Sequence, residues 1–298
     1  MTKIYFGINN CWAVKRWPLP EDWAEVYRKL DVGEVQFSFD LLDPRTLKGA
    51  LEYETARVKE VAQAYGIKIQ STFTGLGAYS WNLLGHPDAA MRADALDWYL
   101  SALRVTAEMG VKATGGHIAS KSAKDHLDPS RRAQIDGEIM EGVKVLRGRA
   151  KSLGLEMLLW EPMPVPREKP WTLEDARDVL KTANQGDGVP VKLNIDLGHQ
   201  CNSLGPDGDP YQWLAELGAD SPVIHLQQTD GKADRHWPFS PRINEIGMIK
   251  PDKVISSIEK SGVKEVHAFL EYIPPFEEND QEVIKNLEET VKYWKQFV

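Results

Sequence analysis

Residues 155–160 read Leu155-Glu156-Met157-Leu158-Leu159-Trp160, a short apolar run followed directly by Glu161. A run of this length predicts a buried strand. A segment with helical spacing follows it, opened by Thr172 with Asp175 three residues later, which is close to a capping box. The same unit of strand then helix recurs along the chain. We predict the other strands at residues 4–8, 34–39, 67–72, 111–117, 191–195, 223–226 and 265–270.

Each predicted strand is followed by a predicted helix. The helices begin or lie at Pro20, 47–65, Pro87 to Gly110, 129–152, Thr172, Pro210 to Gly218, 251–262 and 280–297. Eight such units indicate a parallel α/β sheet, and eight strands are the number that closes a (β/α)8 TIM barrel. A doubly wound open sheet is the alternative, because strand count alone does not show closure. The sequence has no linker or low-complexity segment, so we predict a single domain over residues 1–298.

Composition excludes several classes of protein. The 298 residues include 36 basic and 44 acidic side chains, which gives a net charge of −8 and argues against nucleic-acid binding as the main task. Two cysteines, Cys11 and Cys201, are too few for a secreted disulfide framework. The N-terminal residues show no signal-peptide pattern, and no stretch approaches 18 uncharged apolar residues. We therefore expect a cytoplasmic protein that binds neither nucleic acid nor membrane.

Potential metal ligands stand at the ends of four consecutive predicted strands in the second half of the chain. In a TIM barrel the reactive residues lie at the carboxyl ends of the strands. One such acid could merely cap a strand or pair with a loop arginine, but four in succession are much less expected by chance. Three neighbouring buried carboxylates would be costly without a cation, so we predict a divalent metal site. Its ligands would be Glu161, Asp196, His225 and Glu271.

The donor set limits which metal would bind. Three carboxylates and one imidazole make a hard, oxygen-rich site, which suits Mn²⁺ or Mg²⁺ and also allows Co²⁺. We expect Mn²⁺ first among these. A structural zinc site rich in thiolates is excluded.

These four residues, each at the end of a successive strand, resemble the xylose isomerase-like superfamily of sugar isomerases and epimerases. The ketose 3-epimerase branch fits best, and the likeness covers nearly the whole chain. It implies a TIM-barrel enzyme of carbohydrate metabolism whose partner is a small sugar or sugar phosphate. We expect the assembly to be a homodimer or a homotetramer.

Two local patterns agree with this resemblance. Asp196-Leu197-Gly198-His199 is similar to the family's D-x-x-H, in which the aspartate binds metal and the histidine contacts a substrate oxygen. The stretch from Glu161 to Glu168 reads EPMPVPRE and resembles an E-P-M-x-x-P-R-E stretch in members that handle four-carbon ketose phosphates or branched oxo-acids. The resemblance thus makes His199 and Glu168 candidate substrate-binding residues.

The chain departs from the 3-epimerase pattern after the seventh strand. Those enzymes carry a histidine two residues after the metal histidine, where this chain has Gln227. Their substrate-binding arginine lies in the following loop, and here Thr229–Pro238 is different. Arg235 and Arg242 are candidates for that role. These differences bear on the identity of the substrate more than on the chemistry.

Two further residues could touch substrate, and each has a purely structural alternative. His117 ends the fourth predicted strand and is equally well explained as a hydrogen-bonded barrel histidine. Trp12 follows the first predicted strand and could pack on a sugar face, although packing against a loop or the core is favoured.

The residues support proton transfer next to a carbonyl. A bound cation would polarise the oxygens of an α-hydroxy ketone and stabilise an enediolate. By the likeness to the epimerases, Glu161 and Glu271 would be the acid–base pair, with Asp196 and His225 mainly ligands. The leading hypothesis is a metal-dependent isomerase or 3-epimerase of a small keto-sugar or its phosphate.

Three alternatives stay open from the sequence. The first is a metal-dependent lyase that decarboxylates a 3-oxo sugar acid, with the loop arginines holding the carboxylate. The second is a nuclease of the endonuclease IV type, which the charge of −8 and the seven scattered histidines disfavour. The third is a sugar-binding protein without catalysis, which the metal ligands disfavour.

Overall fold

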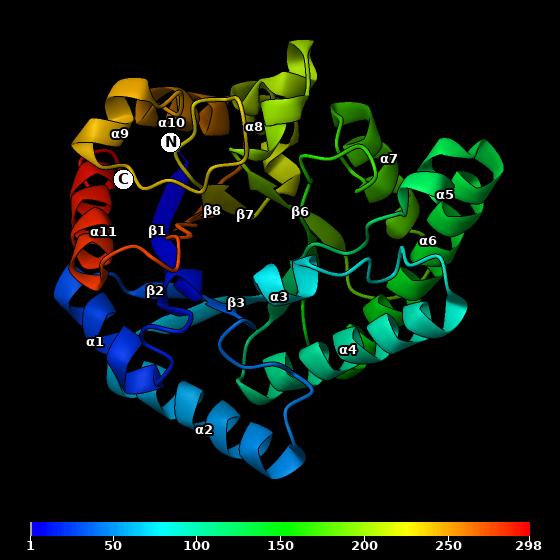
Figure 1. Ribbon diagram of the computed structural model, residues 1–298, viewed down its shortest axis with the longest axis horizontal. Helices are drawn as coiled ribbons and strands as arrows, with labels where there is room; N and C mark the ends of the chain where they lie inside the picture. Colours follow the sequence, from blue (N-terminus) through cyan, green and yellow to red (C-terminus); the bar gives the residue numbers. More distant parts are fainter. Residues whose placement is uncertain (1) are drawn as a thin grey trace. The chain divides into compact units, whose positions relative to one another are not determined.

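The computed structural model describes residues 2–298 and shows eight parallel strands in sequence order around a closed barrel (Figure 1). The predicted (β/α)8 TIM barrel is therefore confirmed, and the open sheet is excluded. The strands are β1 (Lys3–Asn9), β2 (Glu34–Ser38), β3 (Lys68–Phe73), β4 (Ala113–Gly116), β5 (Met157–Trp160), β6 (Val191–Asp196), β7 (Val223–Leu226) and β8 (Glu265–Leu270).

The helices predicted between and after the strands are present. They are α1 (Pro20–Leu30), α2 (Lys48–Ala64), α4 (Ala89–Glu108), α6 (Pro129–Ser152), α7 (Leu173–Ala183), α8 (Pro210–Leu217), α10 (Pro251–Lys260) and α11 (Asp280–Trp294). The predicted cap of α7 is confirmed, because the Thr172 hydroxyl accepts a hydrogen bond from the Asp175 N–H at 3.0 Å.

Three short helices were not predicted. They are α3 (Gly75–Tyr79), α5 (Ala123–Leu127) and α9 (Pro241–Ile246), which follow β3, β4 and β7. Five or six residues are too few to show a helical period, so these segments read as loops in the sequence. Four 3-10 turns also occur among the described residues, at Asn10–Ala13, His199–Asn202, Gly205–Gly208 and Gly218–Asp220.

The chain divides into two compact units. Unit 1 comprises the chain up to Phe37 with Glu60–Ile69 and Leu193–Val298, and unit 2 comprises Ser38–Lys59 with Gln70–Lys192. The boundaries cross β2, α2, β3 and β6 and do not fall in a linker. The single-domain span of residues 1–298 stays a prediction.

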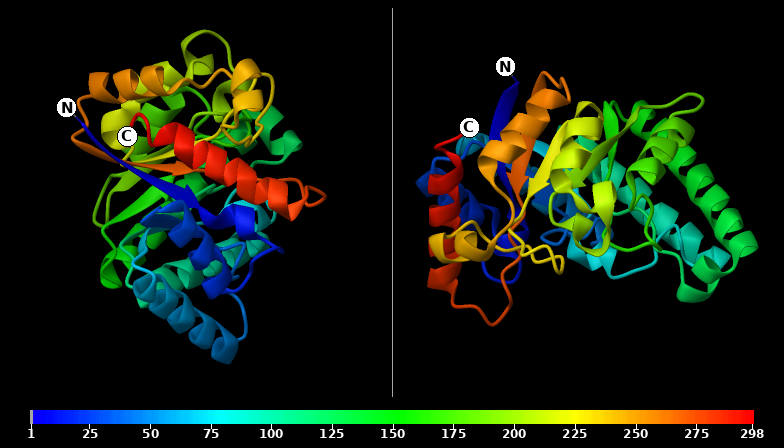
Figure 2. Two further views of the ribbon diagram at one scale, coloured as in Figure 1. Left: turned by 90° about the vertical axis from the view of Figure 1, so that its left-hand side faces the viewer. Right: turned by 90° about the horizontal axis from the view of Figure 1, so that it is seen from above.

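In unit 1, four strands pair in a register that aligns reactive residues. β1 and β7 both pair with β8, and β6 pairs with β7 so that Asp196 lies opposite His225. Helix α11 runs beside β1 (Figure 2), where the rings of Phe6 and Trp294 stack at 6.5 Å. The buried Trp294, only 1% exposed, anchors this helix to the strand layer.

In unit 2, β4 and β5 approach each other closely because of glycine. Their four residue pairs run from Ala113 opposite Met157 to Gly116 opposite Trp160. A Cβ atom on Gly115 would lie 1.8 Å from the carbonyl oxygen of Leu159. No side chain fits at that position unless the two strands separate.

We expect Gly115→Ala to lower the free energy of unfolding by about 3 kcal/mol or more, since the backbone must move to admit the methyl group. Gly148 is the matched control, because it is exposed on α6 and a Cβ atom there would meet nothing within 4 Å. Gly148→Ala should raise stability by about 0.8 kcal/mol through helix propensity. Urea unfolding of both variants measures the two effects, and an unchanged midpoint for Gly115→Ala would contradict the close approach.

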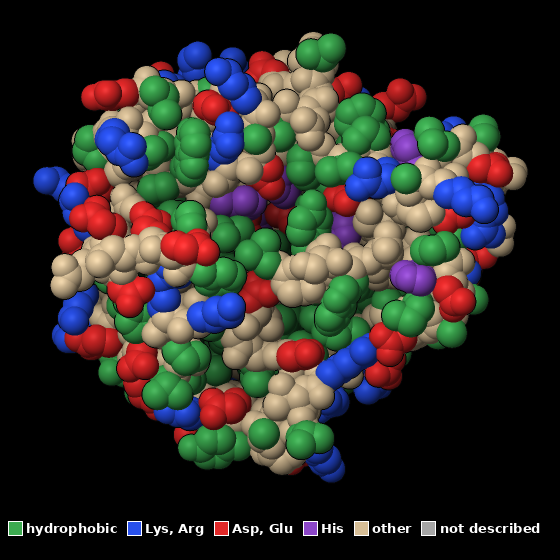
Figure 3. Space-filling view, in the orientation of Figure 1, with side chains coloured by type: hydrophobic (Ala, Val, Ile, Leu, Met, Phe, Trp, Pro, Cys, Tyr) green, Lys and Arg blue, Asp and Glu red, His purple; other side chains and the backbone are tan. Residues whose placement is uncertain are grey.

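Three features of the described residues bear on the classes of protein considered from composition. None of the helices within residues 2–298 combines the length and apolar character needed to cross a bilayer. Cys11 and Cys201 are free thiols. On the face seen in Figure 3, Lys and Arg side chains are interspersed with Asp and Glu.

Candidate active site

Three of the four predicted metal ligands lie together in unit 1. Asp196 ends β6, His225 lies in β7, and Glu271 directly follows β8. The Nδ1 atom of His225 is 2.9 Å from Glu271 Oε2 and 3.8 Å from Asp196 Oδ2. All three side chains are buried, and their candidate ligand atoms lie within 4.8 Å of one another. We call them the acidic trio.

Buried amides determine which nitrogen of His225 faces the carboxylates of Asp196 and Glu271. Asn9 accepts the Cys11 N–H through Oδ1, so its Nδ2 must be the atom that donates to Gln36 Oε1 at 2.8 Å. Gln36 Oε1 in turn lies 2.6 Å from His225 Nε2, which must therefore carry the hydrogen. The lone pair of His225 is then on Nδ1, the atom turned toward the two carboxylates. This is the orientation that a metal ligand needs.

The acidic trio fits a divalent cation. Among residues 2–298, neither Asp196 Oδ2 nor Glu271 Oε2 accepts a hydrogen bond, although Glu271 Oε2 lies 2.9 Å from His225 Nδ1. Burial raises the pKa of Asp196 to about 6, and the neighbouring Glu271 adds to the effect. A bound cation would give these two carboxylate oxygens a partner and offset the cost of burying the Asp196 charge. The carboxylate oxygens and imidazole nitrogen are donors that Mn²⁺, Mg²⁺ and Co²⁺ accept.

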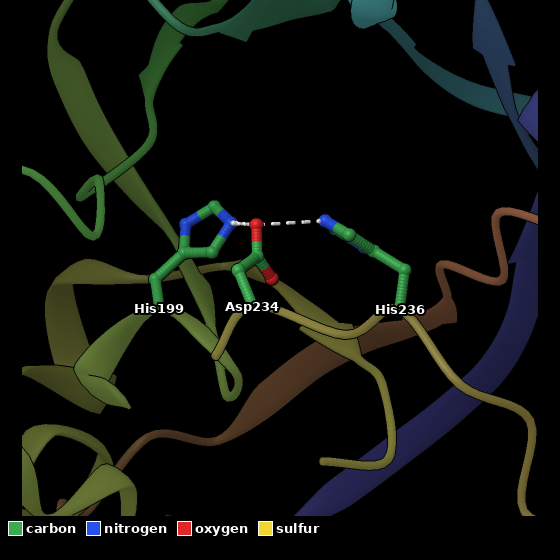
Figure 4. A group of neighbouring side chains, drawn as sticks. All are labelled: His199, Asp234 and His236. Atoms are coloured by element: carbon green, nitrogen blue, oxygen red, sulfur yellow. Dashed lines mark hydrogen bonds and ion pairs between the residues drawn. The ribbon is translucent and has the colours of Figure 1, made fainter. Parts of the chain in front are cut away.

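A second group of ionisable side chains lies in the same unit (Figure 4). Asp234 Oδ2 is 3.4 Å from His199 Nε2 and 3.1 Å from His236 Nε2, so one carboxylate oxygen faces both imidazoles. His236 also approaches the acidic trio, since its Nδ1 lies 3.5 Å from Glu271 Oε2. His236 is not among the site residues predicted from the sequence.

Charge within this second group opposes metal binding. Burial alone would lower the pKa of His236, but Asp234 and Glu271 outweigh it and raise the pKa to about 9. Burial alone would raise the pKa of Asp234, whereas His199 and His236 hold it far below its usual range. A cation at His199, Asp234 and His236 would have to displace the proton on His236, so the acidic trio is the better metal site.

The fourth predicted ligand lies in unit 2. Glu161 directly follows β5, is 2% exposed, and donates its backbone N–H to the Gly116 carbonyl at 3.0 Å. In the same unit Glu168 is buried and accepts a hydrogen bond from the Tyr79 hydroxyl at 3.4 Å. The Tyr79 ring meets the edge of His117 at 5.0 Å. Tyr79 thus contacts both Glu168 and His117, which are predicted substrate-binding residues. The sequence around Tyr79 gave no sign of these contacts.

The two candidate arginines lie in unit 1, on the segment after β7. The Arg235 guanidinium pairs with Asp230 at 3.1 Å and lies 5.0 Å over the Trp237 ring. Arg242 is exposed on α9. Both line a cavity of about 420 Å³ whose wall also includes Tyr272. Their role in substrate binding stays a prediction.

Trp12 lies in the core. It is fully buried, and its ring packs 5.3 Å from Trp17 and 6.4 Å from Tyr27. These contacts account for Trp12 without a ligand, and its predicted contact with a sugar stays untested.

Polar residues inside strands were missed as site residues. Asn9, Gln36 and Asn194 are fully buried, and Asn194 lies 3.1 Å from His225 Nε2. The signal was in the sequence: an amide within an apolar strand needs a buried partner.

Comparisons with known proteins agree with this geometry. The family profile described as a xylose isomerase-like TIM barrel matches residues 25–296. D-erythrulose 1-phosphate 3-epimerase of Brucella abortus is 28% identical over 299 residues, covering 98% of this chain and 95% of the relative.

Solved structures show the same likeness. A putative xylose isomerase from Rhodospirillum rubrum superposes with a TM-score of 0.93 at 31% identity, and the match covers 99% of each chain. D-psicose 3-epimerase from Clostridium cellulolyticum H10 has a TM-score of 0.73 at 13% identity, with 98% of this chain and 99% of that chain covered. At 13% identity the second similarity is one of fold alone.

Proposed function

Because this chain belongs to the xylose isomerase-like TIM-barrel family and is an enzyme of that family, we propose that it is a divalent-metal-dependent 3-epimerase of a small ketose phosphate. The observation that carries the proposal is the buried acidic trio at the carboxyl ends of β6, β7 and β8. The name of the Brucella abortus relative supports the reaction and the substrate class.

Four residues would hold the cation. To the acidic trio we add Glu161, which follows β5, because β5 precedes β6 in the barrel and active sites form at the carboxyl ends of barrel strands. Mn²⁺ is our first choice of metal. When bound, the cation would supply Lewis acidity to the substrate oxygens that become negative as the neighbouring proton leaves.

The protein side chains then carry the proton. One glutamate takes the hydrogen from C3 as a proton, and the C–H electron pair moves to the C2 carbonyl. The second glutamate delivers a proton to the opposite face of C3, which restores the carbonyl and inverts C3. We assign these roles to Glu161 and Glu271, both of which are almost fully buried and therefore shielded from bulk water.

Recognition of the phosphate is the finer part of the proposal. Arg235 and Arg242 line one cavity, and a guanidinium can donate paired hydrogen bonds to a phosphate. The stretch from Glu161 to Glu168 resembles members that act on four-carbon ketose phosphates. A tetrulose 1-phosphate is therefore the first substrate to test.

We expect the Mn²⁺-loaded enzyme to convert D-erythrulose 1-phosphate into its C3 epimer and to place solvent deuterium at C3 in D₂O. Proton NMR of the carbon-bound hydrogen measures the label, and chiral analysis measures the epimer. Free erythrulose should react at least about 100-fold more slowly, since two hydrogen bonds to a phosphate are worth roughly 1.5–3 kcal/mol each. Arg235→Ala and Arg242→Ala should reduce this preference.

Other outcomes would identify a different activity. Release of CO₂ from a 3-oxo sugar acid, without epimerisation of any ketose, would indicate the lyase. Epimerisation without deuterium even at long times would contradict proton transfer through the glutamates. Equal rates on free and phosphorylated tetruloses, pentuloses and hexuloses would contradict the proposed recognition of a phosphate group. The proposed epimerase activity would still stand.

A further inference from the structure

Gln227 connects a proposed metal ligand to the segment after β7. It is fully buried, and its Nε2 lies 2.8 Å from Asp196 Oδ1 and 2.7 Å from Asp234 Oδ1. Its Oε1 accepts the backbone N–H groups of Arg235 at 3.2 Å and His236 at 2.5 Å. Every hydrogen-bonding position of this side-chain amide is therefore in use.

The orientation of this amide follows from its partners. A backbone N–H can only donate, so the atom that faces Arg235 and His236 must be the oxygen. The NH₂ group is then turned toward the carboxylates of Asp196 and Asp234, which can only accept when ionised. A glutamate or an apolar residue at 227 could not make both sets of bonds.

Gly198 leaves the space that Gln227 occupies. A Cβ atom at position 198 would lie 2.2 Å from the Gln227 side-chain carbonyl carbon. The Gly198 N–H also donates to Asp196 Oδ1 at 2.6 Å, the same oxygen that Gln227 contacts. Because two donors hold Oδ1 of Asp196, its Oδ2 is the oxygen that faces the other two members of the acidic trio.

We infer that Gln227 is a positioning residue, which holds Asp196 for the metal and fixes the segment that sets His236 beside Glu271. Its first half rests on the proposed metal site, and its second half rests only on the hydrogen bonds that Gln227 accepts from Arg235 and His236. At this position the chain departs from the 3-epimerase pattern, so the bridge belongs to this chain's own segment after β7.

Two variants test the inference by separate routes. Gln227→Leu removes the amide, and Gly198→Ala displaces it without changing residue 227. In both we expect amide hydrogen exchange at Arg235 and His236 to become at least about 10-fold faster. Mn²⁺ affinity measured by calorimetry should fall about 10-fold or more, as when an outer partner of a metal ligand is lost. Neither measurement uses a substrate, so failure of the proposed reaction would leave both readouts intact.

Gln228 provides the matched control. It is equally buried, and its amide bonds to Asn244 and to both the N–H and the carbonyl of Ile249, with no bond to a site carboxylate. Gln228→Leu should speed exchange at Ile249 and lower the melting temperature, yet leave Mn²⁺ affinity within twofold of wild type. Retained protection at Arg235 and His236 in both test variants would overturn the inference. An unchanged Mn²⁺ affinity in those variants would overturn it as well.

Discussion

Glu271→Gln and Glu161→Gln should each reduce kcat for epimerisation by about 10³-fold, within the range that a positioned acid–base group contributes. Glutamine keeps the shape of the side chain but cannot take a proton at neutral pH. The Glu271 carboxylate lies 2.9 Å from His225 and 3.5 Å from His236, and the substitution replaces one of its oxygens with an NH₂ group. Rates are measured at saturating Mn²⁺.

The two variants should differ in which epimer they label. A variant with one working glutamate can remove the C3 proton from one face and return deuterium to that same face. One variant should therefore exchange the C3 hydrogen of one epimer in D₂O without inverting it, and the other variant should exchange only the other epimer. This pattern separates two bases on opposite faces from a single base.

Glu259 is the control for loss of a carboxylate, because it is exposed on α10, away from the proposed site. Glu259→Gln should keep kcat within twofold of wild type. If Glu161→Gln or Glu271→Gln retains a tenth of the wild-type rate with its metal in place, that residue is not one of the proton carriers.

The barrel could be predicted because each unit carries local signals. Pro251 begins α10, and Gly262 lies just beyond its end, as expected from the φ of proline and from the freedom of glycine after a helix. The strand Val223–Leu226 lies between Pro222 and the polar Gln227, so its limits could also be predicted. Closure of the barrel did not follow from these local signals, because the number of strands does not specify how they pair.

The site could be predicted only where chain order carries the information. Asp196, His225 and Glu271 were found because each ends an apolar run, and runs that are strands in a barrel bring their ends together. The roles of Gln36 and Gln227 depend on which atoms their amides face in three dimensions. Gln36 lies 189 residues from His225, and no local pattern links the two.

Removal of the metal is the other change with a large expected effect. Dialysis against a chelator should reduce turnover by about 10³-fold, because Lewis acidity contributes several kcal/mol and each 1.36 kcal/mol is about a factor of ten in rate. Adding Mn²⁺ should restore the activity, and elemental analysis should find about one ion per chain. A content near two would place a second ion at His199, Asp234 and His236.

Variants of the acidic trio identify the ligands themselves. Asp196→Ala and His225→Ala should each weaken Mn²⁺ binding by more than about 100-fold, since even the outer partners of ligands are worth about 10- to 100-fold. His267 is the control, because it is a buried histidine in the adjacent strand β8. It pairs with Glu34 at 2.6 Å and stacks on Tyr5, away from the acidic trio. His267→Ala should leave Mn²⁺ affinity unchanged. Full occupancy in both trio variants would mean that the cation binds elsewhere, and chelation without loss of activity would mean that the buried carboxylates act without one.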